Sequence, residues 1–198
     1  TIEQQVEHLK NKGVAFTLCT EEQAASFLAY STFFFKVKAF DKDYEINPKT
    51  GKYLNLDFAY LMELSTLDMH LRRLILHATL DLEHYLKVML IREISENPDE
   101  DGYEIVDRFF SVYPEVKASI SAKSENSMCC DLIRKLEKEG YAVWNLIEVL
   151  SFGDLVMLCE VYDQNTGGKN EDLFRCLFAV RCLRNAAAHN NCLLNSMR

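Results

Sequence analysis

The hydrophobic positions of the chain repeat mainly at intervals of three and four residues, the spacing that puts side chains on one face of an α-helix. The longest repeat lies between residues 56 and 95. Its members are Leu64, Leu67, Leu71, Leu74, Ala78, Leu82, Tyr85 and Met89. We therefore predict one long helix with a single apolar stripe, ended by Asn97-Pro98 and Gly102.

Two shorter helices are predicted before the long one. Residues 2–11 have helical spacing and are followed by Gly13, a helix terminator. The second helix begins after Thr20, whose hydroxyl can form a capping box with Gln23. It continues into the aromatic segment 30–40, where the spacing favours helix over strand, and residues 41–54 are predicted to be a loop.

Further helices are predicted along the rest of the chain. They cover residues 103–110, 114–120, 131–139, 144–150 and 152–162, and a last long helix capped by Asn170. Ser151 is a plausible cap between two of them. Only 7 Gly and 3 Pro occur in 198 residues, which disfavours a sandwich or barrel rich in tight turns. The predicted fold class is all-α.

The composition indicates a folded protein of one domain's length. With 48% hydrophobic residues the chain can build a packed core. The seven cysteines include no CxxC pair, so neither a disulfide framework nor a zinc ribbon is indicated. No apolar run reaches the roughly 18 residues of a membrane span, and the opening segment is amphipathic. We expect a soluble, cytoplasmic protein without a membrane partner.

The charge is acidic overall but uneven. A net charge of -8 argues against non-specific coating of nucleic acid, which depends on Lys and Arg. Between Lys169 and Arg198, however, five basic residues face two acidic ones, so this stretch carries +3 and residues 1–168 carry -11. A nucleic-acid site is therefore expected near the C-terminus.

Three histidines on the long helix suggest a metal site at first. His70, His77 and His84 recur every seven residues, and seven residues of helix rise about 10 Å, so the imidazoles cannot share one ion. A packing or interface-edge role is expected for them. The chain also has no HExxH, GxxxxGK[ST], GxGxxG or GxSxG motif. We expect no metal and no cofactor.

The segment VRCLRNAAAHNN, residues 180–191, carries the candidate chemistry. Arg184 continues the apolar spacing of Leu177 and Val180, where an unpaired buried cation would be costly. Either a carboxylate pairs with it, or this face borders a polar cleft or a subunit interface. Asn185 and His189 share one helix face, and Arg184 lies about 100° round the helix.

This segment resembles a known signature. Arg184, the polar Asn185 and His189 match the Arg, four-to-six residues, His motif of the HEPN superfamily of helical ribonucleases. Nearly the full chain is similar to the Abi-like abortive-infection proteins of the AbiD/AbiF type found in bacteria. The similar segments are EQQVEHLKNKG, AYSTFFFKVKAF, LDMHLRRLILHATLDLEHYLK, WNLIEVLSFGDLVMLCEVY and LRNAAAHN. One departure is Asn191-Cys192-Leu193, where the family often has an Arg followed by an aromatic residue.

The resemblance implies a fold, an activity and partners. Residues 55–198 would form a HEPN-like helical bundle, and residues 1–54 an additional N-terminal helical segment packed on it. The activity would be metal-independent RNA cleavage in phage defence, at a composite cleft between two subunits. Single-stranded regions of RNA, a second copy of the chain, and an antitoxin or regulatory RNA are the expected partners.

The resemblance also assigns roles to residues. His189 would transfer a proton and Arg184 would stabilise phosphate charge, while Asn185 would orient His189 or the 2′-OH of RNA. Arg181 and Asn190 would bind substrate. The alternative is a non-catalytic HEPN-type module that binds RNA or protein, including one within a toxin–antitoxin system. Asn191 and the net charge of -8 favour this alternative.

Overall fold

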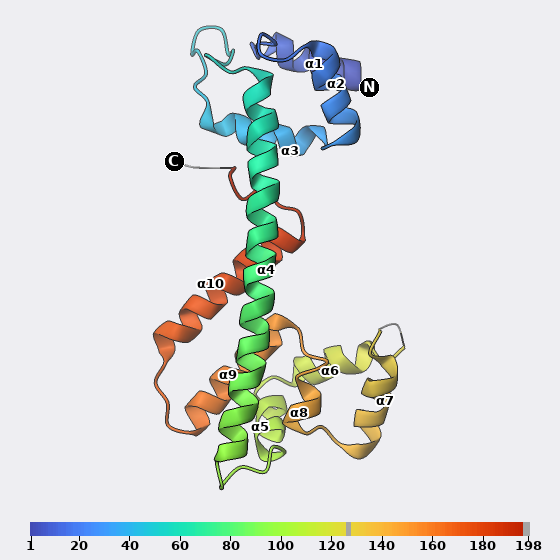
Figure 1. Cartoon of the computed structure of the whole chain (residues 1–198), viewed down its shortest axis with the longest axis vertical. Helices are drawn as coiled ribbons and strands as arrows, with labels where there is room; N and C mark the ends of the chain where they lie inside the picture. The colour runs from blue at the N-terminus through green and yellow to red at the C-terminus, as the bar shows by residue number, and fades with distance from the viewer. Residues whose placement is uncertain (126–127, 196–198) are drawn as a thin grey trace. The chain divides into compact units, whose positions relative to one another are not determined.

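A computed structural model describes residues 1–125 and 128–195. The described residues form ten α-helices, one 3-10 helix and no strand, which confirms the predicted all-α class. The elements (Figure 1) are α1 (Ile2–Asn11), α2 (Glu21–Tyr30), α3 (Phe34–Ala39), η1 (Phe40–Asp43), α4 (Phe58–Glu96), α5 (Glu104–Val112), α6 (Pro114–Ala122), α7 (Cys130–Glu139), α8 (Val143–Leu146), α9 (Phe152–Asn165) and α10 (Glu171–Ala188).

The chain forms two compact units. Unit 1 comprises Thr1–His77 and Arg184–Arg198, and unit 2 comprises Ala78–Leu183. Helices α4 and α10 therefore each contribute residues to both units. These units do not coincide with the division into residues 1–54 and 55–198 expected from the sequence, which stays a prediction.

Local sequence signals set the helix ends in unit 1. The Thr20 N–H donates to Gln23 Oε1 (2.8 Å) and the Gln23 N–H donates to Thr20 Oγ1 (3.2 Å), which confirms the predicted capping box of α2. Gly13 has a φ of +86°, and a β-carbon there would lie 2.8 Å from the Lys52 β-carbon. Only glycine fits this turn without strain.

The aromatic segment after α2 differs from its prediction. It is not one continuous helix, because Phe33 has extended backbone (φ −122°, ψ 151°) and separates α2 from α3. This break lets Val37 and Phe40 reach the core of unit 1, where they lie buried with Leu9, Phe58 and Leu61. The spacing alone indicated the helices but not the turn between them.

A buried carboxylate ties the start of α4 to the preceding chain. Asp57 accepts hydrogen bonds from the Ala59 N–H (3.0 Å), the Thr17 N–H (2.8 Å) and the Thr17 hydroxyl (2.7 Å). Burial raises the pKa of Asp57, but these hydrogen bonds outweigh it and hold the pKa below its usual value. Asp57 therefore caps α4 as an ionised group.

Unit 2 packs the middle helices around one core. The core includes Leu90 of α4, Phe109 of α5 and Leu155 of α9, all almost fully buried. The Asp154 N–H donates to Ser151 Oγ (3.2 Å), which confirms the predicted cap of α9. The helix predicted over residues 144–150 ends early, at Leu146, because Val149 N–H bonds back to Leu146 O in a tight turn before α9.

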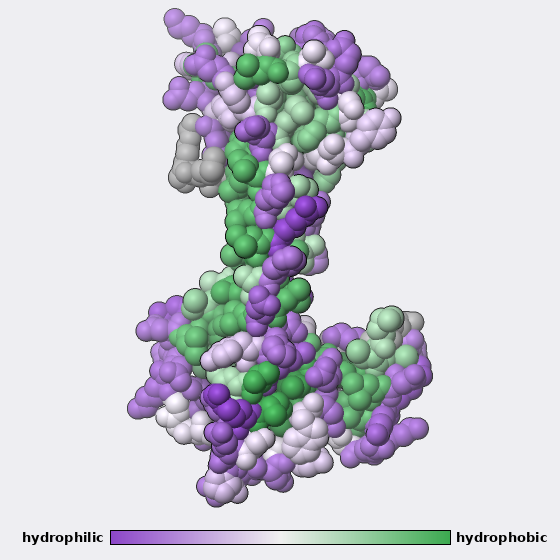
Figure 2. Space-filling view, viewed as in Figure 1, coloured by the Kyte–Doolittle hydropathy of each residue, from purple (hydrophilic) through white to green (hydrophobic). Residues whose placement is uncertain are grey.

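The predicted apolar stripe of α4 is buried only in part. Three of its members pack against the hydrophobic cores of the two units, whereas Leu67, Leu74 and Tyr85 are 55%, 66% and 61% exposed. The face that is fully buried in unit 1 carries Leu61 with the polar Ser65 and Asp68. A hydropathy pattern marks apolar positions only, so it missed the polar residues of this face. Figure 2 shows the resulting apolar surface along α4 in unit 1.

No helix in the described part of the chain is both long and apolar enough to cross a bilayer.

Candidate functional site

The motif residues lie at the C-terminal end of α10. The helix ends at Ala188, and His189 is the C-cap residue. The backbone N–H of His189 donates to Asn185 O (2.9 Å). The Asn191 N–H donates to Ala186 O (2.9 Å) and the Asn190 N–H to Ala187 O (3.2 Å). Asn190 has a φ of +60°. This is a Schellman ending, in which asparagine is one of the few residues that accept the left-handed conformation.

Arg184 is half-buried and has a neutral partner. Its Nη1 donates to Asn185 Oδ1 (3.3 Å). Among the described residues of unit 1 no carboxylate forms an ion pair with Arg184. The structural alternative of an Arg–carboxylate pair is therefore not found in this unit, and the guanidinium charge is not neutralised there.

His189 is exposed to solvent. Within unit 1, as far as it is described, its side chain makes no hydrogen bond, ion pair or ring contact. An exposed imidazole without such partners can exchange a proton with a bound molecule, which is the role expected for it.

Asn190 connects the end of α10 to α3. The Lys36 ammonium donates to Asn190 Oδ1 (2.7 Å) and to the Asn190 carbonyl oxygen (3.3 Å). The Lys36 side chain is only 5% exposed, so this contact lies inside unit 1. The Cys192 thiol adds a contact of 3.5 Å to the Lys36 carbonyl oxygen. The turn that follows His189 is thus held by α3.

A buried carboxylate completes this anchor. Asp68 is fully buried and accepts hydrogen bonds from Arg72 Nε (2.9 Å), the Leu193 N–H (2.6 Å) and the Leu194 N–H (3.2 Å). Its Oδ2 also lies 3.5 Å from the Lys36 Nζ. Burial raises the pKa of Asp68, but these donors and the Lys36 charge outweigh it and lower the pKa below the usual value. Asp68 is ionised and fixes the segment after α10.

Sequence reasoning missed the group Lys36, Asp68 and Arg72, which we term the anchor cluster. One signal could have found part of it. Asp68 follows Leu61 at a helical interval of seven and precedes Arg72 by four, which is the spacing of a helical ion pair. Lys36 carries no such signal, because its contact depends on tertiary structure.

A cavity opens beside the anchor cluster. It has a volume of about 370 Å³ and lies entirely within unit 1. Its walls include Phe27, Phe33, Ser65, Arg72 and Asn190. The structure thus places Asn190, a predicted substrate-binding residue, at a cavity, although its substrate role stays a prediction.

Arg181, the other predicted substrate-binding residue, belongs to unit 2. It lies one turn before Arg184 along α10, and its guanidinium carbon lies 4.5 Å from the centre of the Phe178 ring. A β-carbon at Gly153 would lie 2.8 Å from the Arg181 Cδ, so the Arg181 side chain packs against α9. Its half-buried stem is held in place by these contacts.

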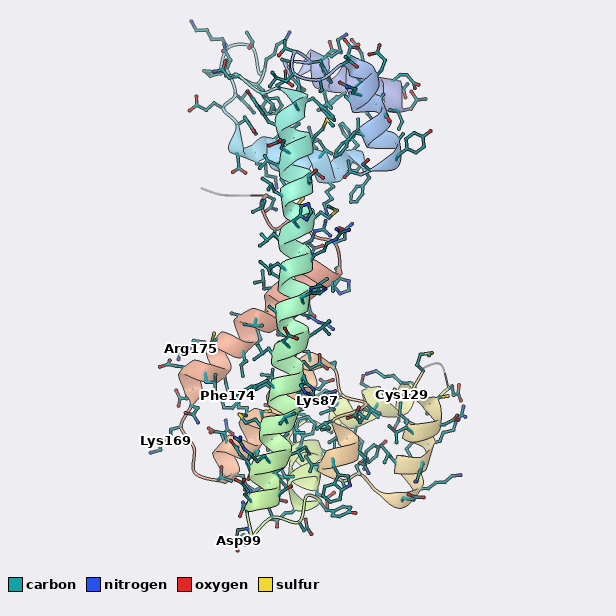
Figure 3. All side chains as sticks on the ribbon, in the orientation of Figure 1. Lys87, Asp99, Cys129, Lys169, Phe174 and Arg175 are labelled. Atoms are coloured by element: carbon teal, nitrogen blue, oxygen red, sulfur yellow. The ribbon has the colours of Figure 1, made fainter. Side chains whose placement is uncertain are left out.

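Lys169 and Arg175, two further basic residues of the C-terminal stretch, are exposed. Figure 3 shows Lys169 and Arg175 directed away from unit 2 into solvent. Arg175 Nη1 lies 3.2 Å from Asp172 Oδ1, a surface pair that contributes little to stability. Arg198, the last residue of the predicted +3 stretch, lies outside the described residues.

The three histidines of α4 are all exposed. In the described ranges, no group of three or more His, Cys, Asp or Glu residues is arranged to hold a metal ion. The interface-edge role expected for these histidines stays a prediction.

The fold is all-α, and its last helix, α10, ends in the predicted motif. Arg184 of this motif is half-buried, and Asn185 and His189 are exposed. A family model described as Abi-like protein matches residues 26–195. The chain belongs to this family, as the resemblance predicted, and a place in the HEPN superfamily is consistent with it. Membership suggests abortive infection, a form of phage defence. Comparisons with curated proteins and with solved structures give no match.

Proposed function

We propose that the protein is a metal-independent endoribonuclease of bacterial phage defence that cleaves RNA at a composite site between two subunits. The observation that carries this proposal is the state of Arg184 and His189. Both lie at one end of α10, and within the described part of unit 1 neither has a charged partner. A cation and an imidazole without charged partners are what phosphoryl transfer needs.

The chemistry uses the nucleophile that RNA itself provides. An imidazole accepts the proton of a 2′-OH, the 2′ oxygen forms a bond to the adjacent phosphorus, and the bond from phosphorus to the 5′ oxygen breaks. The leaving 5′ oxygen then takes a proton. The products are a 2′,3′-cyclic phosphate and a 5′-OH, and no metal ion is required.

Each motif residue has a separate part in this reaction. His189 transfers a proton, and the Arg184 guanidinium stabilises the charge that develops on the phosphate oxygens. Asn185 accepts a hydrogen bond from Arg184 and so orients the guanidinium. Arg181 holds a flanking phosphate, and Asn190 contacts the substrate near His189.

Two subunits are proposed because the reaction needs both a proton acceptor and a proton donor. One chain supplies a single motif histidine, and a second copy supplies the other. The exposed Leu67 and Leu74 of unit 1 support this proposal, since large apolar side chains are commonly covered by a partner. The homodimer is an isologous one, with the same surface used by both copies.

The second candidate function is a non-catalytic module that binds RNA or a protein partner, alone or in a toxin–antitoxin system. Asn191 favours it, because this residue provides no cation after the His-Asn pair and its N–H is used to end α10. The net charge of -8 favours it as well. Phosphate contacts would then be too few for efficient cleavage.

The experiment that separates the two functions is an assay on single-stranded RNA in the presence of EDTA. The proposed enzyme still cleaves and leaves a 2′,3′-cyclic phosphate, which mass spectrometry of the fragments identifies. Activity that disappears in EDTA and returns with Mg²⁺ contradicts this mechanism. Binding without any cleavage supports the second function.

A further inference from the structure

The cavity beside the anchor cluster has the features of a ligand site. Its volume of about 370 Å³ lies within the range of small-molecule sites, roughly 300 to 1,000 Å³. Aromatic side chains of Phe27 and Phe33 form part of the wall, and Lys36 and Arg72 supply positive charge. None of the described residues that line the cavity is acidic. Such a wall fits a ligand that is both aromatic and anionic.

Lys36 and Arg72 differ in whether they have N–H donors left for a ligand. The Lys36 Nζ already has three acceptors within 3.5 Å, two on Asn190 and one on Asp68, which matches the three donors of an ammonium. Arg72 uses only its Nε, in the bond to Asp68. Among the described residues its two terminal nitrogens have no partner, so one edge of the guanidinium remains for an anion.

The hydroxyl groups of Thr32 and Ser65 in the cavity wall lack hydrogen-bond partners among the described residues. Thr32 Oγ1 is buried and has no hydrogen bond within the part of the chain that is described. Ser65 is 7% exposed, and its hydroxyl makes no hydrogen bond to a described residue. A buried polar atom without a partner is costly, so the Thr32 hydroxyl favours a ligand with hydrogen-bonding edges, and the Ser65 hydroxyl offers such a ligand a second partner.

We propose that this cavity binds one nucleotide, with its base against Phe27 and Phe33 and its phosphate on the terminal nitrogens of Arg72. A base provides an aromatic face for the phenylalanines and polar edges for Thr32 and Ser65. A fatty carboxylate would leave both hydroxyls against hydrocarbon, and inorganic phosphate would leave the aromatic wall uncovered. One part of this inference rests on the proposed function, namely that the bound nucleotide is an unpaired residue of the RNA substrate.

The position of Asn190 connects this cavity to the motif. Asn190 lines the cavity and directly follows His189 in the chain. An RNA whose nucleotide occupies the cavity therefore has a neighbouring phosphate within reach of the turn that carries His189. In this arrangement the cavity selects an unpaired nucleotide at a defined distance from the cleaved bond.

Isothermal titration calorimetry of the full chain with the four 5′-mononucleotides tests the proposal. At least one mononucleotide binds, and it binds more tightly than inorganic phosphate or the corresponding nucleoside. Thr66→Trp fills the cavity from an exposed position on α4 and weakens binding by more than about tenfold, since the indole and the base need the same space. Tyr60→Trp, at another exposed position of α4 and outside the cavity wall, is the matched control and binds like the wild type.

A second variant keeps the test decisive if Thr66→Trp does not fold, which thermal unfolding followed by circular dichroism reveals. Phe33 is 53% exposed, so its replacement is tolerated. Phe33→Ala weakens nucleotide binding between about 5-fold and 100-fold, whereas Phe33→Tyr retains it. The proposal is overturned if no mononucleotide binds to the wild type, or if folded Phe33→Ala and Thr66→Trp proteins bind as the wild type does.

Competition in the His189→Ala protein identifies the source of the nucleotide. A single-stranded oligonucleotide that displaces the mononucleotide makes the cavity part of the RNA site. A mononucleotide that is not displaced makes it a site for a free nucleotide, with the same chemistry. Nucleotide binding in a wild type that never cleaves RNA removes the proposed function and leaves this inference standing. RNA cleavage by a wild type that binds no mononucleotide overturns this inference and leaves the proposed function standing.

Discussion

Arg184 and Asp68 are charged residues that each follow apolar residues at helical intervals, and their surroundings in the fold differ. Among the described residues of its unit, Arg184 has the neutral Asn185 as its hydrogen-bond partner, whereas Asp68 is fully buried and surrounded by donors. The sequence singles out Arg184, as a charge at an apolar interval within a motif, but not Asp68. The partners of Asp68 include Lys36 and the backbone of Leu193, which are distant in the chain, so the sequence gives no sign of them.

Asp68→Asn should destabilise unit 1. The change leaves Lys36 buried without its counterion, and loss of one partner of a buried pair costs about 3 kcal/mol or more. The folded-state pKa of Asp68 is lowered, so its stabilisation is present above the unfolded pKa of about 3.9 and is lost as pH falls through the folded value. Urea unfolding of wild type and variant should therefore differ most at neutral pH and converge in acid.

Asp81→Asn provides the control for this prediction, since Asp81 is an exposed residue of the same helix. It should change the free energy of unfolding by less than about 0.5 kcal/mol. A constant difference between wild type and Asp68→Asn from pH 7 down to pH 2 would contradict the ionised state assigned to Asp68.

At the scale of the element, the end of α10 depends on one asparagine. Asn190 supplies both the left-handed backbone that ends the helix and the acceptor for Lys36. Asn190→Ala loses the acceptor and strains the backbone, and should lower the free energy of unfolding by about 2 to 3 kcal/mol. Asn190→Gly loses only the acceptor and should be about 1 kcal/mol more stable than Asn190→Ala in the same urea titration. Equal stabilities would show that the turn does not need this conformation.

The helices themselves could be predicted from the sequence, because capping boxes and terminators act locally. The Thr20–Gln23 box and the Ser151 cap are examples. The buried face of α4 could not be predicted, because it carries the polar residues Ser65 and Asp68. Asp68 is held there by donors that are distant in the chain, such as the Leu193 N–H. The motif at the end of α10 was found from the sequence, whereas the anchor cluster that holds it was not.

At the scale of the whole molecule, the proposed reaction requires two copies of the chain. Light scattering coupled to size exclusion at micromolar concentration should give twice the chain mass. Leu74→Arg replaces an exposed apolar residue of unit 1 by a cation and should shift the protein toward monomer, since burial of that charge in an interface is unfavourable. A clean wild-type monomer would contradict the composite site.

The most direct measurement is the RNA cleavage rate of His189→Ala beside its RNA affinity and melting temperature. His189 is exposed, so its removal should leave the melting temperature unchanged. If it transfers a proton in the transition state, the rate should fall by about 10² to 10⁴-fold with little change in affinity. Arg184→Ala should lower rate and affinity together, and Gln164→Ala, at an exposed position of α9, should change neither. A His189→Ala protein that cleaves as fast as the wild type would contradict the assignment of this site.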